Sequence, residues 1–420
     1  MSAPLDPADC GCSDYALSRR SVLRGAAVAG AAGVATSLIG DVTTSSVFGA
    51  EPGGNVLVVL SQRGGADGMS LVVPHGEPAY YAARPTIAIA KSELLHADQV
   101  FGLHPAFAPL SPMWTSGRLA ALHAVGLPAP NRSHFAAMEE IEDAAPGSAL
   151  RLGWLNRVVG ALGDEAGIFE GVQLGSNVIP TSLVGPAPTL ALANSTALTT
   201  PYADTEYGPA LRAGLSEMYA AGVGPAHEAG RRALELDANG KVFSAEAAKG
   251  AAHGAAYPAS ALGQALRESA ALIRSGLGVR AITVDSGGWD HHNNLRALLT
   301  SRVSDLASAV AAFFTDLGAD GDRVTLVTLS EFGRRLDENG AAGLDHGYGN
   351  AVLVAGAGVR GGRYHSRWPT LATGKQVEGD LAVTTDYRLV LAEILRARFP
   401  SIDASEVFPG VGHLHLGFMR

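Results

Sequence analysis

The residues of this chain that could do chemistry are concentrated first in one short segment, residues 285–294. The run Asp-Ser-Gly-Gly-Trp-Asp-His-His-Asn-Asn places two carboxylates and two imidazoles within eight positions. Neutral imidazole together with carboxylate suits zinc, manganese or iron, whereas an all-oxygen set would favour calcium or magnesium. We expect Asp290 and His292 to ligate a metal. Adjacent imidazoles rarely face the same way, so His291 is the expected bystander; a histidine pair in a solvated loop is the alternative.

Two later segments carry the same residue types. Glu331 follows an apolar run at residues 324–329, and Arg334, three residues further on, could bind an oxyanion bidentately. A plain ion pair between Glu331 and Arg334 is the alternative. Asp345 and His346 stand directly before another apolar run, and either could complete a metal site.

Two turns nearer the N-terminus add further candidates. Asp67 lies in a glycine-rich turn and could ligate a cation, although an Asp-Gly pair equally suits an ordinary turn. Ser133 precedes an apparent helix and could be a metal-activated nucleophile, with Arg132 orienting the substrate. The alternative for Ser133 is a helix N-cap, and the amides of such a helix start could receive an anion.

These candidates follow, or directly precede, short apolar runs rich in β-branched residues, the pattern of strands buried on both faces. In open α/β sheets, ligands bind outside the carboxyl ends of the strands, which is where most of the candidates would emerge. The predicted strands are residues 55–60, 119–125, 279–284, 324–329 and 351–355.

Helical segments separate these strands and predict an α/β sandwich. Residues 177–258 are rich in Ala, Gly, Thr and Pro and are interpreted as a mostly helical insertion or cap over one edge of the sheet. The glycines of residues 356–361 spell a dinucleotide fingerprint, but no helix is expected after them, so we interpret them as a turn. The predicted helices are residues 134–142, 154–162, 261–274, 295–317 and 386–398, with Thr384 and Thr385 as caps of the last.

Composition excludes some functions. The 420 residues include 31 Lys and Arg against 40 Asp and Glu, a formal charge of -9, so no broad basic surface is expected and nucleic acid is not a predicted partner. The two cysteines are Cys10 and Cys12, and thus no disulfide or thiolate metal site is possible after them.

The first 50 residues are interpreted as an export signal and linker. Paired arginines, Arg19 and Arg20, precede a weakly apolar, alanine-rich run at residues 25–39, which resembles a twin-arginine signal. We therefore expect the twin-arginine translocation machinery as a partner and a periplasmic, cell-envelope or extracellular location. A retained membrane anchor is the alternative, although the run is shorter than the roughly 20 residues of a membrane span.

The motifs together resemble domain-of-unknown-function family 1501, whose members typically carry such a signal. The family is similar to the alkaline phosphatase and sulfatase superfamily, which implies a three-layer sandwich, with a mixed, mostly parallel sheet between helices, over residues 51–420. It also implies a two-metal site at the carboxyl ends of the strands. The resemblance starts near Asn55 and rests on residues 63–68, 132–135, 288–292, 330–334 and 345–347, which occur in the family's order.

The resemblance also implies roles for single residues. Asp67 would correspond to the metal aspartate of the first strand, Ser133 to the nucleophile, and Asp290 with His292 to the first metal pair. His346 would correspond to the last metal histidine, with Asp345 as an added ligand. The superfamily has an Asp-His pair where this chain has Ser330 and Glu331, so one imidazole is lost and a single metal, or none, becomes an alternative to two.

The leading hypothesis from the sequence is an exported, metal-dependent hydrolase of phosphate or sulfate esters. The metal would be zinc or manganese, and the substrate a small anionic ester or an envelope-derived compound. Arg132 or Arg334 would hold the nonbridging oxygens. One alternative is a non-catalytic exported protein that keeps the fold and binds a metal or ligand; another is an envelope accessory factor without metal.

Overall fold

The structure is a computed structural model that describes residues 54–146, 152–163, 168–198 and 205–420. The predicted export signal lies outside these residues. The described residues fall into two compact units, one over residues 205–234 and the other over residues 54–198 and 235–420, with the gaps given above. The second unit holds the sheet and every candidate site residue.

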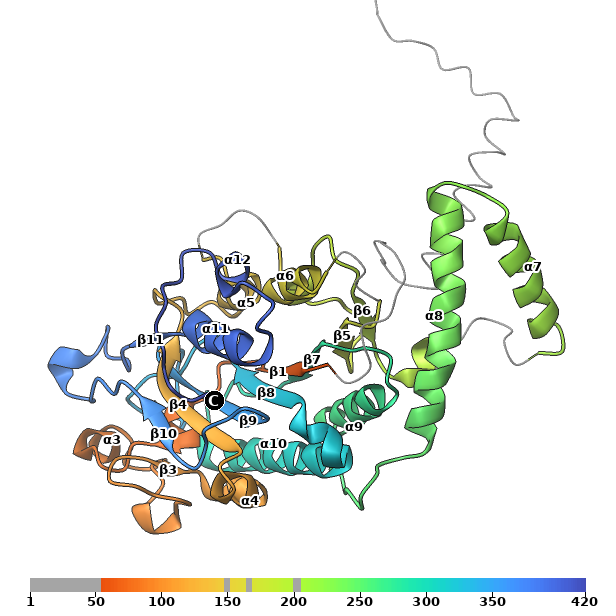
Figure 1. Cartoon of the computed structure of the whole chain (residues 1–420). Helices are drawn as coiled ribbons and strands as arrows, with labels where there is room; N and C mark the ends of the chain where they lie inside the picture. The colour runs from red at the N-terminus through yellow and green to blue at the C-terminus, as the bar shows by residue number, and fades with distance from the viewer. Residues whose placement is uncertain (1–53, 147–151, 164–167, 199–204) are drawn as a thin grey trace, which may run out of the picture. The chain divides into compact units, whose positions relative to one another are not determined.

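The second unit is built on a mixed, mostly parallel sheet flanked by helices (Figure 1). Within the described residues nine strands form this sheet in the order β10-β4-β9-β8-β1-β7-β5-β6, with β11 also pairing with β4. The strands are β1 (Val56–Gln62), β4 (Leu119–Gly126), β5 (Gly171–Leu174), β6 (Leu190–Leu192), β7 (Ala281–Ser286), β8 (Val324–Leu329), β9 (Asn350–Gly356), β10 (Tyr364–Ser366) and β11 (Thr385–Asp386). Two short strands, β2 (Val72–Val73) and β3 (Gly102–Leu103), form a separate antiparallel pair.

One strand of the sheet runs against the others. β9 pairs antiparallel with both β8 and β4, whereas the remaining pairs in this sheet are parallel. The amino end of β9 therefore lies at the edge where its neighbours have their carboxyl ends. Residues before β9 and residues after β1, β4, β7 and β8 thus meet at one edge.

Helices cover both faces of the sheet. In Figure 1, α9 and α10 lie on one side and α5, α6, α11 and α12 on the other. The α-helices are α2 (Gly68–Leu71), α3 (Pro78–Ala83), α4 (Ser111–Thr115), α5 (His134–Asp143), α6 (Trp154–Ala161), α7 (Gly208–Ala220), α8 (Pro225–Ala248), α9 (Ala261–Arg274), α10 (Leu295–Leu317), α11 (Tyr387–Arg398) and α12 (Ala404–Val407).

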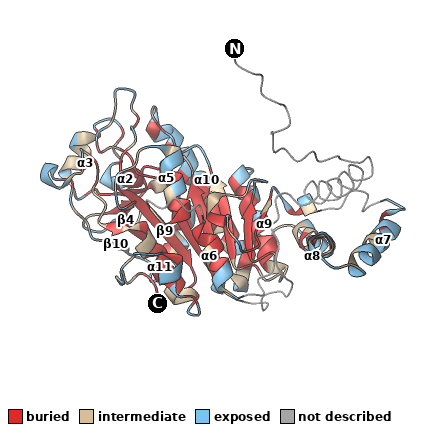
Figure 2. Cartoon of the chain, turned by 90° about the horizontal axis from the view of Figure 1, so that it is seen from above, coloured by how far each residue is buried: buried red, intermediate tan, exposed pale blue. Residues whose placement is uncertain are grey.

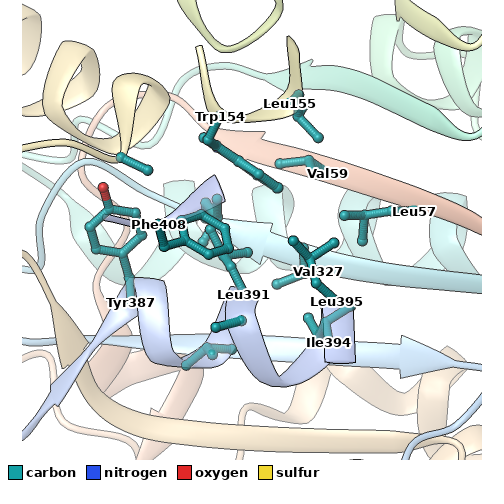
Figure 3. Packing of buried hydrophobic residues seen from close by; sticks show 14 of the residues in the cluster. Leu57, Val59, Trp154, Leu155, Val327, Tyr387, Leu391, Ile394, Leu395 and Phe408 are labelled. Atoms are coloured by element: carbon teal, nitrogen blue, oxygen red, sulfur yellow. The ribbon is translucent and has the colours of Figure 1, made fainter. Parts of the chain in front are cut away.

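The alternation of each strand divides the core between these two helical layers. Leu57 and Val59 of β1 pack in one apolar cluster with Trp154 of α6 and Leu391 of α11 (Figure 3). Every residue of β1 is buried, as expected for a central strand covered on both faces. Fixing β1 in this way also fixes the glycine-rich turn that follows it.

The five strands and five helices predicted from the sequence are present, with ends that shift by a few residues. One cap differs: α11 begins after Asp386, whose side chain accepts from the Arg388 N–H at 2.9 Å, while Thr385 belongs to β11. An aspartate two residues before that N–H is the better acceptor, because its carboxylate is charged.

The predicted insertion, residues 177–258, is only partly helical. It contains the strand β6 and the long helices α7 and α8. In α7 only Gly208 is buried, and Figure 2 accordingly shows this helix as largely exposed.

The helix α10, counted with the turn after it as Leu295–Asp322, is long and apolar enough by composition to cross a membrane. Leu299, Val303 and Leu306, one turn apart along it, are buried within the unit. Their burial is the pattern of a core helix.

Candidate metal centre

Three histidines from different segments meet at the carboxyl edge of the sheet. His134 begins α5 after β4, His292 follows β7, and His346 precedes β9. The Nε2 atoms of His292 and His346 lie 3.0 Å apart, and the rings of His134 and His346 pack with centroids 4.3 Å apart. The reversed direction of β9 is what brings His346 to this edge.

The outward nitrogen of each ring faces an acceptor. Nδ1 of His346 lies 2.9 Å from the carbonyl oxygen of Arg132, which can only accept, so this nitrogen carries the proton. Nδ1 of His292 lies 3.0 Å from Oδ1 of Asp345, and Nδ1 of His134 lies 2.9 Å from Oε1 of Glu331. In the neutral form, all three rings therefore present the lone pair of Nε2 inward.

Asp290 supplies an oxygen at the point where these lone pairs converge. Its Oδ1 lies 3.0 Å from Nε2 of His292 and 3.4 Å from Nε2 of His346, and its Oδ2 lies 3.6 Å from Nε2 of His134. Ligand atoms of His134, Asp290 and His346 all lie within 4.8 Å of one another. In the part of the chain that the structure describes, Nε2 of His134 is buried without a hydrogen-bond partner.

Such an arrangement suits a divalent cation. Lone pairs on two nitrogens 3.0 Å apart repel unless a proton or a cation lies between them. His134, Asp290 and His346 offer imidazole nitrogens and a carboxylate oxygen, and His292 adds a further imidazole beside His346. These are the ligand types that zinc takes, at about 2.0–2.2 Å from each ligand. Manganese and iron accept the same residue types.

Glu331 and Asp345 lie behind the histidines in this geometry. We predicted both as metal ligands, and the structure places each carboxylate at hydrogen-bond distance from an imidazole Nδ1. A carboxylate in this position orients the ring and raises its basicity. Glu331 is buried and also accepts the N–H of Gly64 at 2.8 Å. The bond from His292 lowers the pKa of Asp345.

Arg334 holds Asp290 in place. Its Nη2 lies 2.5 Å from Oδ1 of Asp290, and the guanidinium also donates to the carbonyls of Gly64, Gly65 and Leu344. Burial alone would raise the pKa of Asp290, but the hydrogen bond and charge of Arg334 outweigh it, so this pKa is lowered. Arg334 is 1% exposed, and thus its donors serve the protein rather than a bound oxyanion.

The glycine-rich turn after β1 approaches this centre closely. A Cβ on Gly64 would lie 2.7 Å from the backbone nitrogen of Asp290, and Gly64 has φ +118°. Only glycine adopts this conformation without strain and lets the backbone of Asp290 lie so close. Gly347, next to His346, is similarly confined, since a Cβ there would lie 2.2 Å from the carbonyl carbon of Arg334.

Asp67 is engaged elsewhere. Its two carboxylate oxygens lie 2.6 and 3.0 Å from Nη1 and Nη2 of Arg84, and the side chains are 1% and 0% exposed. Burial raises the pKa of Asp67, but Arg84 outweighs this and the net shift is downward. The bidentate geometry makes Asp67 one half of a buried ion pair, and it does not join the convergent histidines.

Arg132 and Ser133 lie next to the centre. The Arg132 guanidinium bonds Oε2 of Glu378 at 2.7 Å and Oδ2 of Asp380 at 2.5 Å. Ser133 occupies the N-cap position of α5, is exposed, and makes no side-chain capping bond. Its hydroxyl is therefore not committed to the helix end, as the N-cap alternative would require.

His134 is a candidate metal-binding residue that the sequence analysis does not single out. The sequence indicates only that it begins a helix, in the segment that follows a buried strand. His291, the expected bystander, is 4% exposed, and burial lowers its pKa to about 4. It is neutral at physiological pH, and its side chain is not among the groups that converge.

The sheet and its edge residues define an α/β protein with a candidate metal site formed by His134, Asp290 and His346, with His292 beside them. The chain belongs to domain-of-unknown-function family 1501, described as protein of unknown function, whose family model matches residues 101–392. No curated protein matches the sequence significantly.

Proposed function

We propose that this protein is an exported, metal-dependent hydrolase of phosphate or sulfate esters. One divalent cation, zinc or manganese, would be held by His134, Asp290, His292 and His346. The observation that carries the proposal is the convergence of three Nε2 lone pairs on one carboxylate, each ring fixed by an acceptor behind it. Histidines at a surface without a ligand role have no need of this shared orientation.

Ser133 is the nucleophile in this proposal. A bound cation would lower the pKa of the hydroxyl and neutralise charge that develops on the ester. Ser133 adjoins the ligand His134, is exposed, and is not used as a helix cap. Its attack on the phosphorus or sulfur atom would displace the alcohol, and water would then release the phosphate or sulfate from the enzyme.

The start of α5 offers binding for the nonbridging oxygens of the ester. The first intrahelical bond of α5 runs from the Ala137 N–H to the Ser133 carbonyl, which leaves the amides of residues 134–136 available to an anion. They take the role expected of Arg132 and Arg334, both of which are engaged by protein groups.

A relationship with the alkaline phosphatase and sulfatase superfamily supports ester hydrolysis as the reaction. The mixed, mostly parallel sheet with its site at one edge is compatible with that fold. The bonding of Asp67 to Arg84 removes one ligand of a second ion, so we propose one metal rather than two. Export through the twin-arginine translocation machinery, to the periplasm, envelope or exterior, is part of the proposal and rests on Arg19 and Arg20.

The test combines metal content with turnover. Purified protein reconstituted with zinc or manganese is assayed with p-nitrophenyl phosphate and p-nitrophenyl sulfate. We expect Ser133→Ala to keep its metal and lose turnover, and His346→Ala to lose both. Ser301→Ala, an exposed serine on α10, is the control that should keep both. Full turnover by Ser133→Ala would refute the nucleophile.

A non-catalytic binding protein is the second candidate, favoured by the engagement of Arg132 and Arg334 with protein carboxylates and carbonyls. Without a free guanidinium, the site has less to offer the charge of a transition state. Metal-loaded protein that binds its cation but hydrolyses neither ester would favour this second candidate.

A further inference from the structure

A pocket separate from the candidate metal centre lies at the β10 edge of the sheet. Its volume is about 520 Å³, within the range of roughly 300–1,000 Å³ that small-molecule sites occupy. The strand β10 and the C-terminal segment 414–416 form its sides, and Leu122 of β4 and Thr385 of β11 contribute from neighbouring strands. None of its lining residues belongs to the metal centre.

Part of the lining is apolar. Leu414 and Leu416 of the C-terminal segment line it together with Tyr364 of β10, while Leu122 of β4 is almost fully buried. The Tyr364 hydroxyl is already satisfied, since it donates to the carbonyl of His96 at 2.9 Å. The pocket can therefore take a hydrocarbon group on these residues.

The other part of the lining carries a cation. Arg367 follows β10, is exposed, and has neither an ion pair nor a hydrogen bond within the part of the chain that the structure describes. Most other arginines of the second unit that we have named donate to carboxylates or carbonyls. An arginine without a protein partner that lines a pocket is available to a ligand.

The nine lining residues include no Asp or Glu, and one carboxylate lies close to them. The carboxylate of Glu393 lies 3.4 Å from the lining residue His415, but it is buried and accepts four backbone N–H groups of residues 416–419. Those amide dipoles offset part of its charge, which still acts on the lining residue His365 against the lowering of that pKa by burial.

We propose that this pocket binds a small monocarboxylate with an apolar chain. The guanidinium of Arg367 would hold the carboxylate, and Leu414, Leu416 and the ring of Tyr364 would contact the hydrocarbon. The apolar residues of the lining favour a carboxylate that carries a hydrocarbon chain over an inorganic anion. The proposal does not rest on the hydrolase function of the metal centre.

The probe for this proposal is octanoate, with binding to the purified protein followed by isothermal titration calorimetry. We expect saturable binding with one site per chain, and at least tenfold weaker binding to Arg367→Gln. The matched control is Arg267→Gln, an exposed arginine on α9 outside the lining, which should bind as the wild type does. 1-Octanol, which has the chain without the charge, should bind at least tenfold more weakly than octanoate.

Three results would overturn the proposal. These are the absence of octanoate binding at millimolar concentration, equal binding by octanoate and 1-octanol, and unchanged affinity in Arg367→Gln. His346→Ala separates the two sites. Octanoate affinity should not change in this variant, and its loss would place the probe at the metal centre, whatever the outcome of the ester assays.

Discussion

The buried pair of Asp67 and Arg84 gives the sharpest test of how this chain uses a carboxylate that its motif marks as a metal ligand. In Asp67→Asn the guanidinium stays buried at 0% exposure but loses its charged partner. Breaking a buried pair from one side costs about 3–5 kcal/mol. Arg84 keeps bonds to the carbonyls of Arg335 and Leu336, both at 2.9 Å, so we expect about 3 kcal/mol.

The free energy of unfolding is measured by urea titration of metal-free protein, and the metal content is measured on folded, reconstituted protein. Asp337→Asn makes the same chemical change at an exposed position and should cost less than about 0.5 kcal/mol. The double variant Asp67→Asn, Arg84→Met removes the buried charge, so its loss should be smaller than the sum of the two single losses.

Metal content distinguishes the two roles of Asp67. As half of an ion pair, it can be replaced with loss of stability while the folded protein still binds its cation. A variant that is as stable as the wild type but has lost its metal would refute the reasoning and restore Asp67 as a ligand.

Three further predictions follow from particular contacts. In Arg334→Lys, the ammonium cannot reproduce the guanidinium contacts that hold Asp290 and three carbonyls, so metal affinity should fall about 10–100-fold. The affinity is measured by competition with a chelator, and an unchanged value would contradict this role of Arg334. Glu393→Gln leaves the N–H groups of residues 416–419 without a charged acceptor, which should destabilise the C-terminal segment by about 1–3 kcal/mol. Carboxypeptidase should then trim the variant faster than the wild type, and equal trimming rates would contradict the prediction. Burial lowers the pKa of His123 to about 4 against about 6.5 unfolded, so its contribution to stability is present above pH 6.5 and is lost as pH falls towards 4. Between pH 7 and pH 5, the free energy of unfolding from urea titration should fall by up to about 2 kcal/mol less in His123→Gln than in the wild type. An equal fall in both proteins would contradict this.

Much of the sheet was predictable because its strands are short apolar runs. Val56–Gln62 and Val324–Leu329 are buried along their whole length, and such strands need apolar residues on both faces. The direction of β9 was not predictable, since an apolar run reads alike in either direction. That reversal places His346 at the site. Only the structure therefore shows why the Asp345-His346 motif stands before β9 rather than after a strand.

The candidate site was predicted in part. Asp290, His292 and His346 converge, whereas Glu331 and Asp345 lie at hydrogen-bond distance from imidazole Nδ1 atoms. Sequence spacing does not distinguish a carboxylate in the centre from one that hydrogen-bonds a histidine. The partner of Asp67 lies 17 residues away in a segment without any motif, and only packing brings the two together. His134 was hidden by its place at the first position of a helix.

Elemental analysis of the purified protein tests the central claim most directly. The wild type, reconstituted with zinc or manganese and then dialysed, should retain one metal ion per chain, while His346→Ala and Asp290→Asn should retain almost none. A wild type without metal after reconstitution would contradict the metal centre itself, and two ions per chain would contradict the single-ion site.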